Sequence, residues 1–136
     1  MRAILFGLMG TGKTTIRHFL KSPDTLCMLN AIKKLGAKVN ISGNNLEIEG
    51  VQGKLKTADD IINAGNSGII LRFVGALAAL NASYTVITGD HSIRHLRPIK
   101  PLLEGLEQLN VFAKSTKSDG YAPIVIKGPM KGGELT

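Results

Sequence analysis

The segment GLMGTGKTT, residues 7–15, matches the phosphate-loop pattern G-x-x-x-x-G-K-[ST] without a mismatch. The matching residues are Gly7, Gly12, Lys13 and Thr14. A phosphate loop requires strand, loop and helix in that order, so that backbone N–H groups and a helix N-terminus face the phosphates. The residues that follow, TTIRHF over 14–19, instead show the β-branched alternation of a strand.

An internal repeat decides between these two interpretations. The segment TTIRHF aligns with YTVITG over 84–89, and the same offset aligns Arg2 with Arg72. Further along the chain, LEIEG, which ends at Gly50, aligns with IVIKG, which ends at Gly128. Each unit reads helix, strand, helix, strand, strand. The repeat therefore predicts that 2–9 is a helix and that a glycine turn, then a strand, follows it.

The predicted fold is α/β, with two consecutive units over about 1–50 and 65–128, a polar linker over 51–64 and the start of a third unit over 129–136. Helices are expected over 23–35, 65–80 and 98–109. Strands are expected over 14–19, 38–41, 45–50, 83–88, 111–116 and 121–128. An NTP-dependent small-molecule kinase that uses Gly7–Thr14 remains the alternative hypothesis.

Composition narrows the classes of function. The 136 residues are 43% apolar, which suits one globular domain or part of one, and no apolar run is long enough to span a membrane. The net charge of +7 favours anionic partners, but only 4% of residues are aromatic, so we expect small phosphorylated or carboxylated substrates and no nucleic acid. No secretory signal follows Met1, and a single cysteine fits a reducing cytoplasm, where we expect the protein to be.

The segment AGNSGIILRF, residues 64–73, is the strongest candidate for a binding site. Asn66 or Ser67 can cap the helix that follows, and the glycines on either side let a bound group approach the backbone. Arg72 lies four residues after Gly68 and therefore one turn further along the same helix face. A helix N-terminus beside an arginine suits a carboxylate or phosphate. The segment predicts an anion site, and a glycine-containing loop next to a surface arginine is the alternative.

Five segments in order resemble the EPSP synthase family (3-phosphoshikimate 1-carboxyvinyltransferases), the enolpyruvyl transferases of the shikimate pathway. They are RAILFGLMGTGKTTIRHFLKSPDTLCMLNAIKKLGAKV, LEIEGV, AGNSGIILRF, TGDHSIRHLRPIKPLLEGLEQL and GYAPIVIKGPMKGG. Their order and spacing match along almost the whole chain. The enolpyruvyl transferases of cell-wall synthesis resemble it less, because the Arg97–Pro98 helix start and the GYAPIVIKG strand belong to the shikimate branch.

The resemblance implies two similar domains, each an inside-out α/β barrel-like arrangement of three βαβαββ units, with the active site between them. This chain would supply two units of one domain, without the Lys-Ser segment before Arg2, the third unit or the partner domain. The implied reaction transfers enolpyruvyl from phosphoenolpyruvate to shikimate 3-phosphate, without a metal or organic cofactor, in aromatic amino acid biosynthesis. Such a fragment is expected to be inactive alone and to meet a complementing chain, or a second copy of itself, through its unfinished core.

The resemblance also implies roles for individual residues. Arg2 would contact shikimate 3-phosphate. The residues expected to bind phosphoenolpyruvate are Asn66, Gly68, Arg72 and Arg97. The catalytic acid and base would lie outside this chain.

Two departures from the family pattern affect the predicted site. Ile69 stands where family members usually have Thr, which removes a hydroxyl donor and crowds the loop, so weaker binding of the competitive inhibitor glyphosate is expected. The stretch between Gly89 and Arg97 is one residue longer than in many members. Arg94 is therefore an alternative to Arg97 as the phosphoenolpyruvate ligand.

Five further residues have plainer interpretations. Asp24 is expected to cap a helix, and Cys27 is expected to be a core residue. His91 and His95 lie in a turn-like segment without a third ligand nearby, so no metal site is expected. His18 is expected on the exposed face of a strand.

Overall fold

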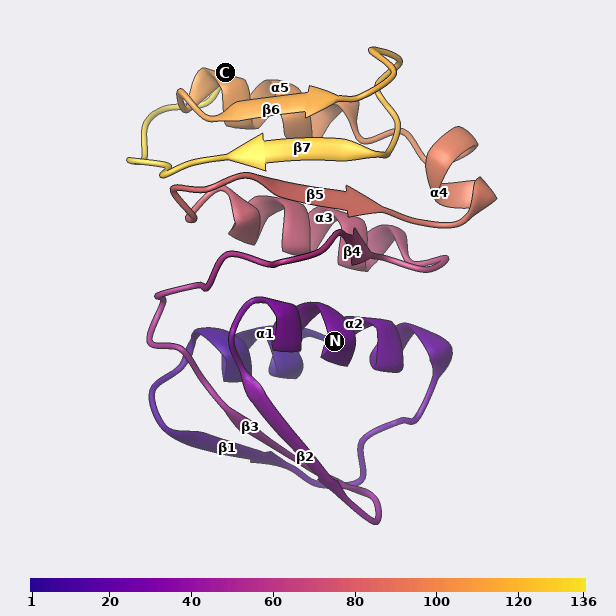
Figure 1. The fold of residues 1–136 in the computed structure, drawn as a ribbon, viewed down its shortest axis with the longest axis vertical. Helices are drawn as coiled ribbons and strands as arrows, with labels where there is room; N and C mark the ends of the chain where they lie inside the picture. Colours follow the sequence, from indigo (N-terminus) through magenta and orange to yellow (C-terminus); the bar gives the residue numbers. More distant parts are fainter.

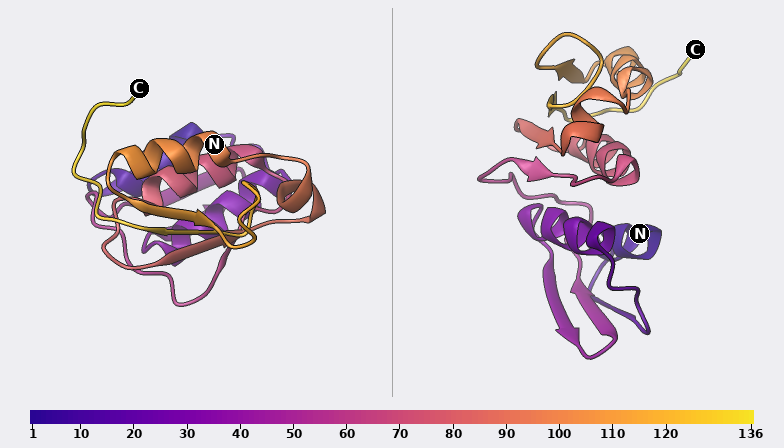
Figure 2. Two further views of the ribbon diagram at one scale, coloured as in Figure 1. Left: turned by 90° about the horizontal axis from the view of Figure 1, so that it is seen from above. Right: turned by 90° about the vertical axis from the view of Figure 1, so that its right-hand side faces the viewer.

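The computed structural model describes residues 1–136 as two α/β units placed one after the other along the long axis of the molecule (Figure 1). Each unit contains one sheet with its helices packed on one face, as the side view in Figure 2 shows. The helices of the first unit lie between its own sheet and the second unit. The two units therefore share a packed boundary.

The first unit contains two helices and three strands: α1 (Arg2–Met9), β1 (Lys13–Ile16), α2 (Pro23–Lys34), β2 (Lys38–Ser42) and β3 (Asn45–Glu49). The second contains three helices and four strands: β4 (Ile62–Asn63), α3 (Gly68–Ala78), β5 (Thr85–Thr88), α4 (His91–His95), α5 (Lys100–Gln108), β6 (Phe112–Ser115) and β7 (Ile124–Lys127). Apart from β4 and α4, every element was predicted, and most observed elements are shorter than expected.

The two sheets have the same topology, which confirms the repeat. Their strand orders are β1-β3-β2 and β4-β5-β7-β6, and the three strands common to both pair antiparallel in each sheet. Thr14 lies opposite Ile48 in the first sheet, and Thr85 lies opposite Ile126 in the second. With β3 and β7 aligned as predicted, Thr14 of β1 is equivalent to Thr85 of β5. The predicted alignment of Thr14 with Tyr84 is therefore wrong by one position.

Backbone hydrogen bonds also join the end of each unit to its first helix. The amide of Val51 donates to the carbonyl of Leu8, and the amide of Met130 donates in the same way to the carbonyl of Ala79. The segment after the last strand of each unit therefore packs against the end of the first helix of that unit. The alignment of Arg2 with Arg72 stays a prediction, and Arg2 is the first residue of α1 whereas Arg72 lies one turn into α3.

The phosphate-loop pattern at residues 7–15 folds as helix end, turn and strand. α1 ends at Met9, Gly12 has a φ of +75°, and β1 begins at Lys13. Because no helix follows Lys13, the backbone N–H groups of this segment cannot surround a phosphate as a phosphate loop does. The kinase alternative is therefore wrong. β1 is also shorter than expected, since the chain turns at His18, which has a φ of 54° and does not lie on a strand.

Replacing Lys13 with alanine is expected to leave both stability and nucleotide affinity unchanged. Lys13 is exposed at the edge of the first sheet. Titration of ATP with Mg²⁺ into the wild-type chain, followed by calorimetry, should give no heat of binding. Tight Mg²⁺-dependent ATP binding that disappears in Lys13→Ala would contradict this expectation.

The predicted linker over 51–64 contains β4, which pairs parallel with β5 through Ile62 opposite Ile87. The side chain of Ile62 is fully buried, and the amide of Ala64 donates to the carbonyl of Thr88 at 2.8 Å. This part of the segment therefore belongs to the second sheet. With β4, the second unit is a complete βαβαββ unit, while the first shows the same order from its first helix onward.

α2 shows how local sequence sets the ends of a helix. Ser22 caps its start by accepting a hydrogen bond from the amide of Thr25 at 3.1 Å. At its end, Gly36 has a φ of +110°, and the amides of Gly36 and Ala37 donate to the carbonyls of Lys33 and Ile32. This is the Schellman arrangement, which favours glycine because the left-handed conformation crowds a Cβ.

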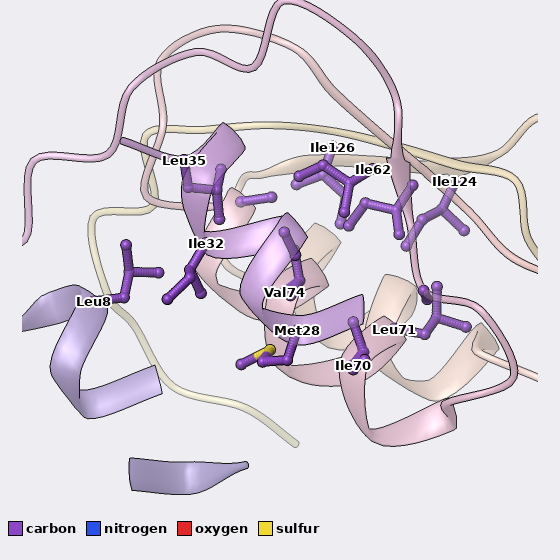
Figure 3. Close-up of a cluster of buried hydrophobic side chains, with 14 of the residues drawn as sticks. Leu8, Met28, Ile32, Leu35, Ile62, Ile70, Leu71, Val74, Ile124 and Ile126 are labelled. Atoms are coloured by element: carbon purple, nitrogen blue, oxygen red, sulfur yellow. The ribbon is translucent and has the colours of Figure 1, made fainter. Parts of the chain in front are cut away.

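The core runs through both units as one cluster of Leu, Ile, Val, Met and Ala side chains (Figure 3). α2 contacts both β4 and α3, so its buried face joins the two units. Figure 3 labels Leu8, Met28, Ile32, Leu35, Ile62, Ile70, Leu71, Val74, Ile124 and Ile126 within this cluster. The two sheets stay open, and no closed barrel forms within the 136 residues. None of the helices is long and apolar enough to cross a membrane.

Candidate anion site

The loop Gly65–Gly68, here called the GNSG loop, leads from β4 into α3. Ser67 caps α3 by accepting a hydrogen bond from the amide of Ile70 at 3.2 Å. The Asn63 side chain accepts a hydrogen bond from the amide of Gly65 at 2.8 Å, which fixes the turn. Ser67 and Gly68 are buried, whereas Asn66 is exposed. The loop therefore presents Asn66 beside the positive end of α3.

A second loop, residues 89–98, lies against the GNSG loop and is here called the arginine loop. The amide of Asp90 donates to the carbonyl of Gly65 at 2.9 Å. The Asn66 side-chain amide donates to Oδ2 of Asp90 at 2.6 Å, and Oδ1 of Asp90 accepts from the amide of Ile93 at 3.0 Å. The hydrogen bond from the Ile93 amide to Asp90 caps the start of α4. This short helix forms where only a turn was predicted. Asp90 therefore links the two loops.

Arg72 and Arg97 both approach the first turn of α3. A Cβ atom placed on Gly68 would lie 2.8 Å from Nη1 of Arg72 and 3.5 Å from Nη1 of Arg97. Nη1 of Arg72 donates to the carbonyl of Gly68, and its Nη2 donates to the carbonyl of Pro98, both at 3.0 Å. Arg72 thus links the GNSG loop to the arginine loop through hydrogen bonds. Arg97 makes one long hydrogen bond, at 3.4 Å, to the Ser92 hydroxyl.

Arg94 is held by its own loop. Its Nε donates to the carbonyl of Gly89 at 3.0 Å and to that of Asp90 at 3.3 Å. The backbone carbonyl of Arg94 in turn accepts a hydrogen bond from Nζ of Lys117 at 2.8 Å. Arg97, and not Arg94, therefore lies next to Gly68.

Arg2 reaches the same region from the first unit. It lines a hollow together with Met1, Ile69 and Phe73, so it lies beside the residue that follows Gly68. Ile69 is 52% exposed there. Figure 1 shows that α2, α3 and α5 start toward the same side of the molecule and that α1 runs in the same direction. The partial positive charges of their first turns add to the charge of the arginines.

Hydrogen bonds, desolvation and nearby charges lower the pKa values of three groups around the arginine loop. Hydrogen bonds from the Ile93 amide and the Asn66 side chain lower the pKa of Asp90, and the charge of Arg97 acts in the same direction. The hydrogen bond from Lys117 is the largest cause that lowers the pKa of Asp119, to about 2. Partial desolvation lowers the pKa of His95, and the positive charges of Lys117 and other neighbours act in the same direction.

Other predicted residues lie away from this arrangement. Asp24 is in the first turn of α2 but does not cap it, because Ser22 does. Cys27 is only half-buried, and its Sγ would lie 2.8 Å from a Cβ placed on Gly65. The rings of His91 and His95 lie 4.6 Å apart on α4, and no third metal-ligating side chain joins them.

Sequence reasoning missed the role of Asp90. A local signal for it existed, because Asp shortly after a predicted strand, with an apolar residue three positions on, is a helix N-cap pattern. Its contact with Asn66, on a different loop and much earlier in the chain, has no local signal.

The chain folds as two repeated α/β units, and the GNSG loop and the arginine loop meet at the start of α3. The EPSP synthase (3-phosphoshikimate 1-carboxyvinyltransferase) family model matches residues 1–136, and the chain belongs to this family.

Named relatives agree with this family membership. The chain is 41% identical over 135 residues to the 3-phosphoshikimate 1-carboxyvinyltransferase of Methanothermobacter thermautotrophicus, covering 99% of this chain and 32% of that protein. It is 47% identical over 120 residues to the enzyme of that name from Methanococcoides burtonii, covering 88% and 28%. A solved EPSP synthase from Acinetobacter baumannii superposes with a TM-score of 0.90 at 26% identity, covering 98% and 30%. The chain thus spans about a third of the length of these relatives.

Proposed function

We propose that this chain provides part of the active site for enolpyruvyl transfer from phosphoenolpyruvate to shikimate 3-phosphate, in a cytoplasmic enzyme of aromatic amino acid biosynthesis. The observation that supports it best is the convergence of Arg72 and Arg97 on Gly68, at the start of α3. The relatives carry the name of this enzyme. In this proposal, phosphoenolpyruvate binds over Gly68, and Asn66 and Arg97 contact its charged groups. Arg72 supports the loop, and Arg2 binds shikimate 3-phosphate.

The chemistry of the reaction suits these residue types. Both substrates are anions, and a planar guanidinium can donate two parallel hydrogen bonds to a carboxylate or phosphate. Groups held in place before the reaction stabilise charge that develops in the transition state. The residues named here bind and orient, so the acid and base that move protons come from other parts of the complete enzyme.

A complementing polypeptide, or a second copy of the chain, is part of the proposal. Phe6 on α1 is 68% exposed, and Ile69 at the start of α3 and Leu80 just after its end are also exposed. In this proposal, these apolar side chains contact the complementing polypeptide. Size-exclusion chromatography with light scattering, with and without a polypeptide that corresponds to the uncovered two thirds of a relative, tests this association. Restored enolpyruvyl transfer in the mixture would support it, and a persistent inactive monomer would count against it.

The substrate site can be tested on the chain alone. Titration of ¹⁵N-labelled chain with phosphoenolpyruvate should shift the backbone amides of Gly68 to Ile70 and the side-chain Nε signal of Arg97. Arg97→Ala should abolish these shifts, whereas Arg17→Ala, an exposed arginine beyond β1 in the first unit, should leave them unchanged. Absence of any shift in the wild-type chain at millimolar phosphoenolpyruvate would refute the proposed site.

Replacing Ile69 with threonine is expected to strengthen binding of phosphoenolpyruvate and glyphosate about threefold to tenfold. The exposed Ile69 side chain lies in the same hollow as Arg2 and cannot donate a hydrogen bond, whereas a threonine hydroxyl can. Competition titrations with both ligands on wild type and Ile69→Thr measure the change. Ile69→Val keeps the β-branch without a hydroxyl and is the control. Equal glyphosate affinity in wild type and Ile69→Thr would contradict the expectation.

A further inference from the structure

Asp90 makes three contacts that together hold the GNSG loop against the arginine loop. Its backbone amide donates to the carbonyl of Gly65 at 2.9 Å. One carboxylate oxygen accepts from the Ile93 amide at 3.0 Å, and the other accepts from the Asn66 side chain at 2.6 Å. Both carboxylate oxygens are thus engaged, one within its own loop and one across to the other.

We propose that Asp90 is a positioning residue of the phosphoenolpyruvate site, and that its carboxylate holds the Asn66 amide in the orientation that binds the anion. The inference rests on the proposed function. A side-chain amide has two N–H donors. One N–H of Asn66 is used by Asp90, and in this proposal the other donates to the anion. Asp90 itself does not touch the anion.

The sign of the charge makes this role unusual and testable. A carboxylate beside an anion site repels the anion, so by Coulomb's law alone the removal of Asp90 should tighten anion binding. If Asp90 acts through Asn66, its removal should weaken binding instead, because the amide then rotates freely and its order has to be restored on binding. The two mechanisms therefore predict changes in opposite directions.

Two neutral variants separate the contact to Asn66 from the capping of α4. Serine and asparagine are both good N-caps, so Asp90→Ser and Asp90→Asn keep the bond to the Ile93 amide and remove the same charge. The asparagine side chain has a second polar atom, but it can bond to Asn66 only after the Asn66 amide flips, which turns the N–H groups of Asn66 away from their wild-type direction. Serine has a single oxygen and is too short to reach it. Both variants should therefore weaken binding if the orientation of the Asn66 amide matters, whereas both should tighten it if only the charge of Asp90 matters.

The experiment measures phosphoenolpyruvate binding and the Asn66 side-chain amide signals by NMR in wild type and both variants. Asp90→Ser is expected to bind about fivefold to tenfold more weakly than wild type. Asp90→Asn should also bind more weakly than wild type, because it holds the Asn66 amide in the flipped orientation. In the absence of ligand, the two Asn66 side-chain protons should have dispersed shifts and slowed exchange in wild type and random-coil behaviour in Asp90→Ser.

A double-mutant cycle identifies the path of the effect. In the Asn66→Ala background, Asp90→Ser should cause no further loss of affinity, because the group it positions is gone. Glu49→Gln, which removes a carboxylate in the first sheet beside Lys38, is the charge-matched control and should leave binding unchanged.

The outcomes distinguish this inference from the proposed function. Wild-type binding together with equal or tighter binding in Asp90→Ser, or unchanged Asn66 signals in that variant, would overturn the inference and leave the proposed function standing. Absence of phosphoenolpyruvate binding in the wild-type chain would overturn the proposed function, and the inference with it.

Discussion

Gly128→Ala is expected to destabilise the fold by about 3 kcal/mol or more, enough to unfold much of the protein. A Cβ on Gly128 would overlap the carbonyl oxygen of Ala79 and lie 2.9 Å from that of Asn81. The amide of Gly128 also donates to the Asn81 carbonyl at 2.7 Å, so the backbone at the end of β7 lies directly against the end of α3. Backbone atoms on both sides cannot move away as a flexible side chain can.

Urea denaturation followed by circular dichroism measures this effect. Gly105→Ala is the matched control, because a Cβ at this position in α5 has no atom within 4 Å. That variant should gain roughly 0.5–1 kcal/mol from helix propensity. Gly50→Ala should resemble Gly128→Ala, since its Cβ would overlap the carbonyl oxygen of Gly10. A Gly128→Ala protein as stable as wild type would show that the close approach of the two backbones is not required.

Gly68→Ala is expected to weaken phosphoenolpyruvate binding at least tenfold, equivalent to about 1.4 kcal/mol, while stability hardly changes. The added Cβ would lie 2.8 Å from Nη1 of Arg72, the end of a flexible side chain that can move. This movement would break the bond from Arg72 to the Gly68 carbonyl. The methyl group would also occupy the space next to Arg97 where the anion is proposed to bind.

Calorimetric titration of phosphoenolpyruvate into Gly68→Ala and wild type tests this expectation. Thermal unfolding of the same samples should show similar midpoints, because alanine suits the first turn of a helix at least as well as glycine does. The Gly105→Ala control should bind like wild type. Unchanged affinity in Gly68→Ala would exclude binding of the anion over Gly68, and a large loss of stability would show that the substitution had acted through the fold.

The residues that sequence reasoning placed well are those whose signals are local or repeated. The end of α2 before Gly36 and a cap of α3 at Asn66 or Ser67 follow from residues within a few positions, although α3 begins at Gly68 and not at Gly65. β4 was missed because a two-residue strand carries too little pattern, and only its pairing with β5 reveals it. The alignment of Thr14 with Tyr84 was one position short because side-chain similarity does not report strand register, whereas backbone pairing does.

Some residues of the proposed site were likewise predictable from local sequence, and others were not. The GNSG segment and Arg72 were identified from their spacing, since four residues on a helix return to the same face. The choice between Arg94 and Arg97 and the contact from Asp90 to Asn66 could not be predicted in this way. They depend on how the loops at residues 65–68 and 89–98 meet after β4 pairs with β5.

By itself, the sequence GLMGTGKTT and its repeat determined that residues 7–15 run from a helix into a strand, because β-branched alternation and a second copy agree on this order. The sequence likewise determined that the chain has two α/β units and the residue types of the proposed anion site. Only the tertiary structure decided that Arg97 lies beside Gly68 and that Asp90 holds Asn66. The physical reason is that these contacts join segments that lie far apart in the chain, and their geometry is set by strand pairing and helix packing and not by local preference.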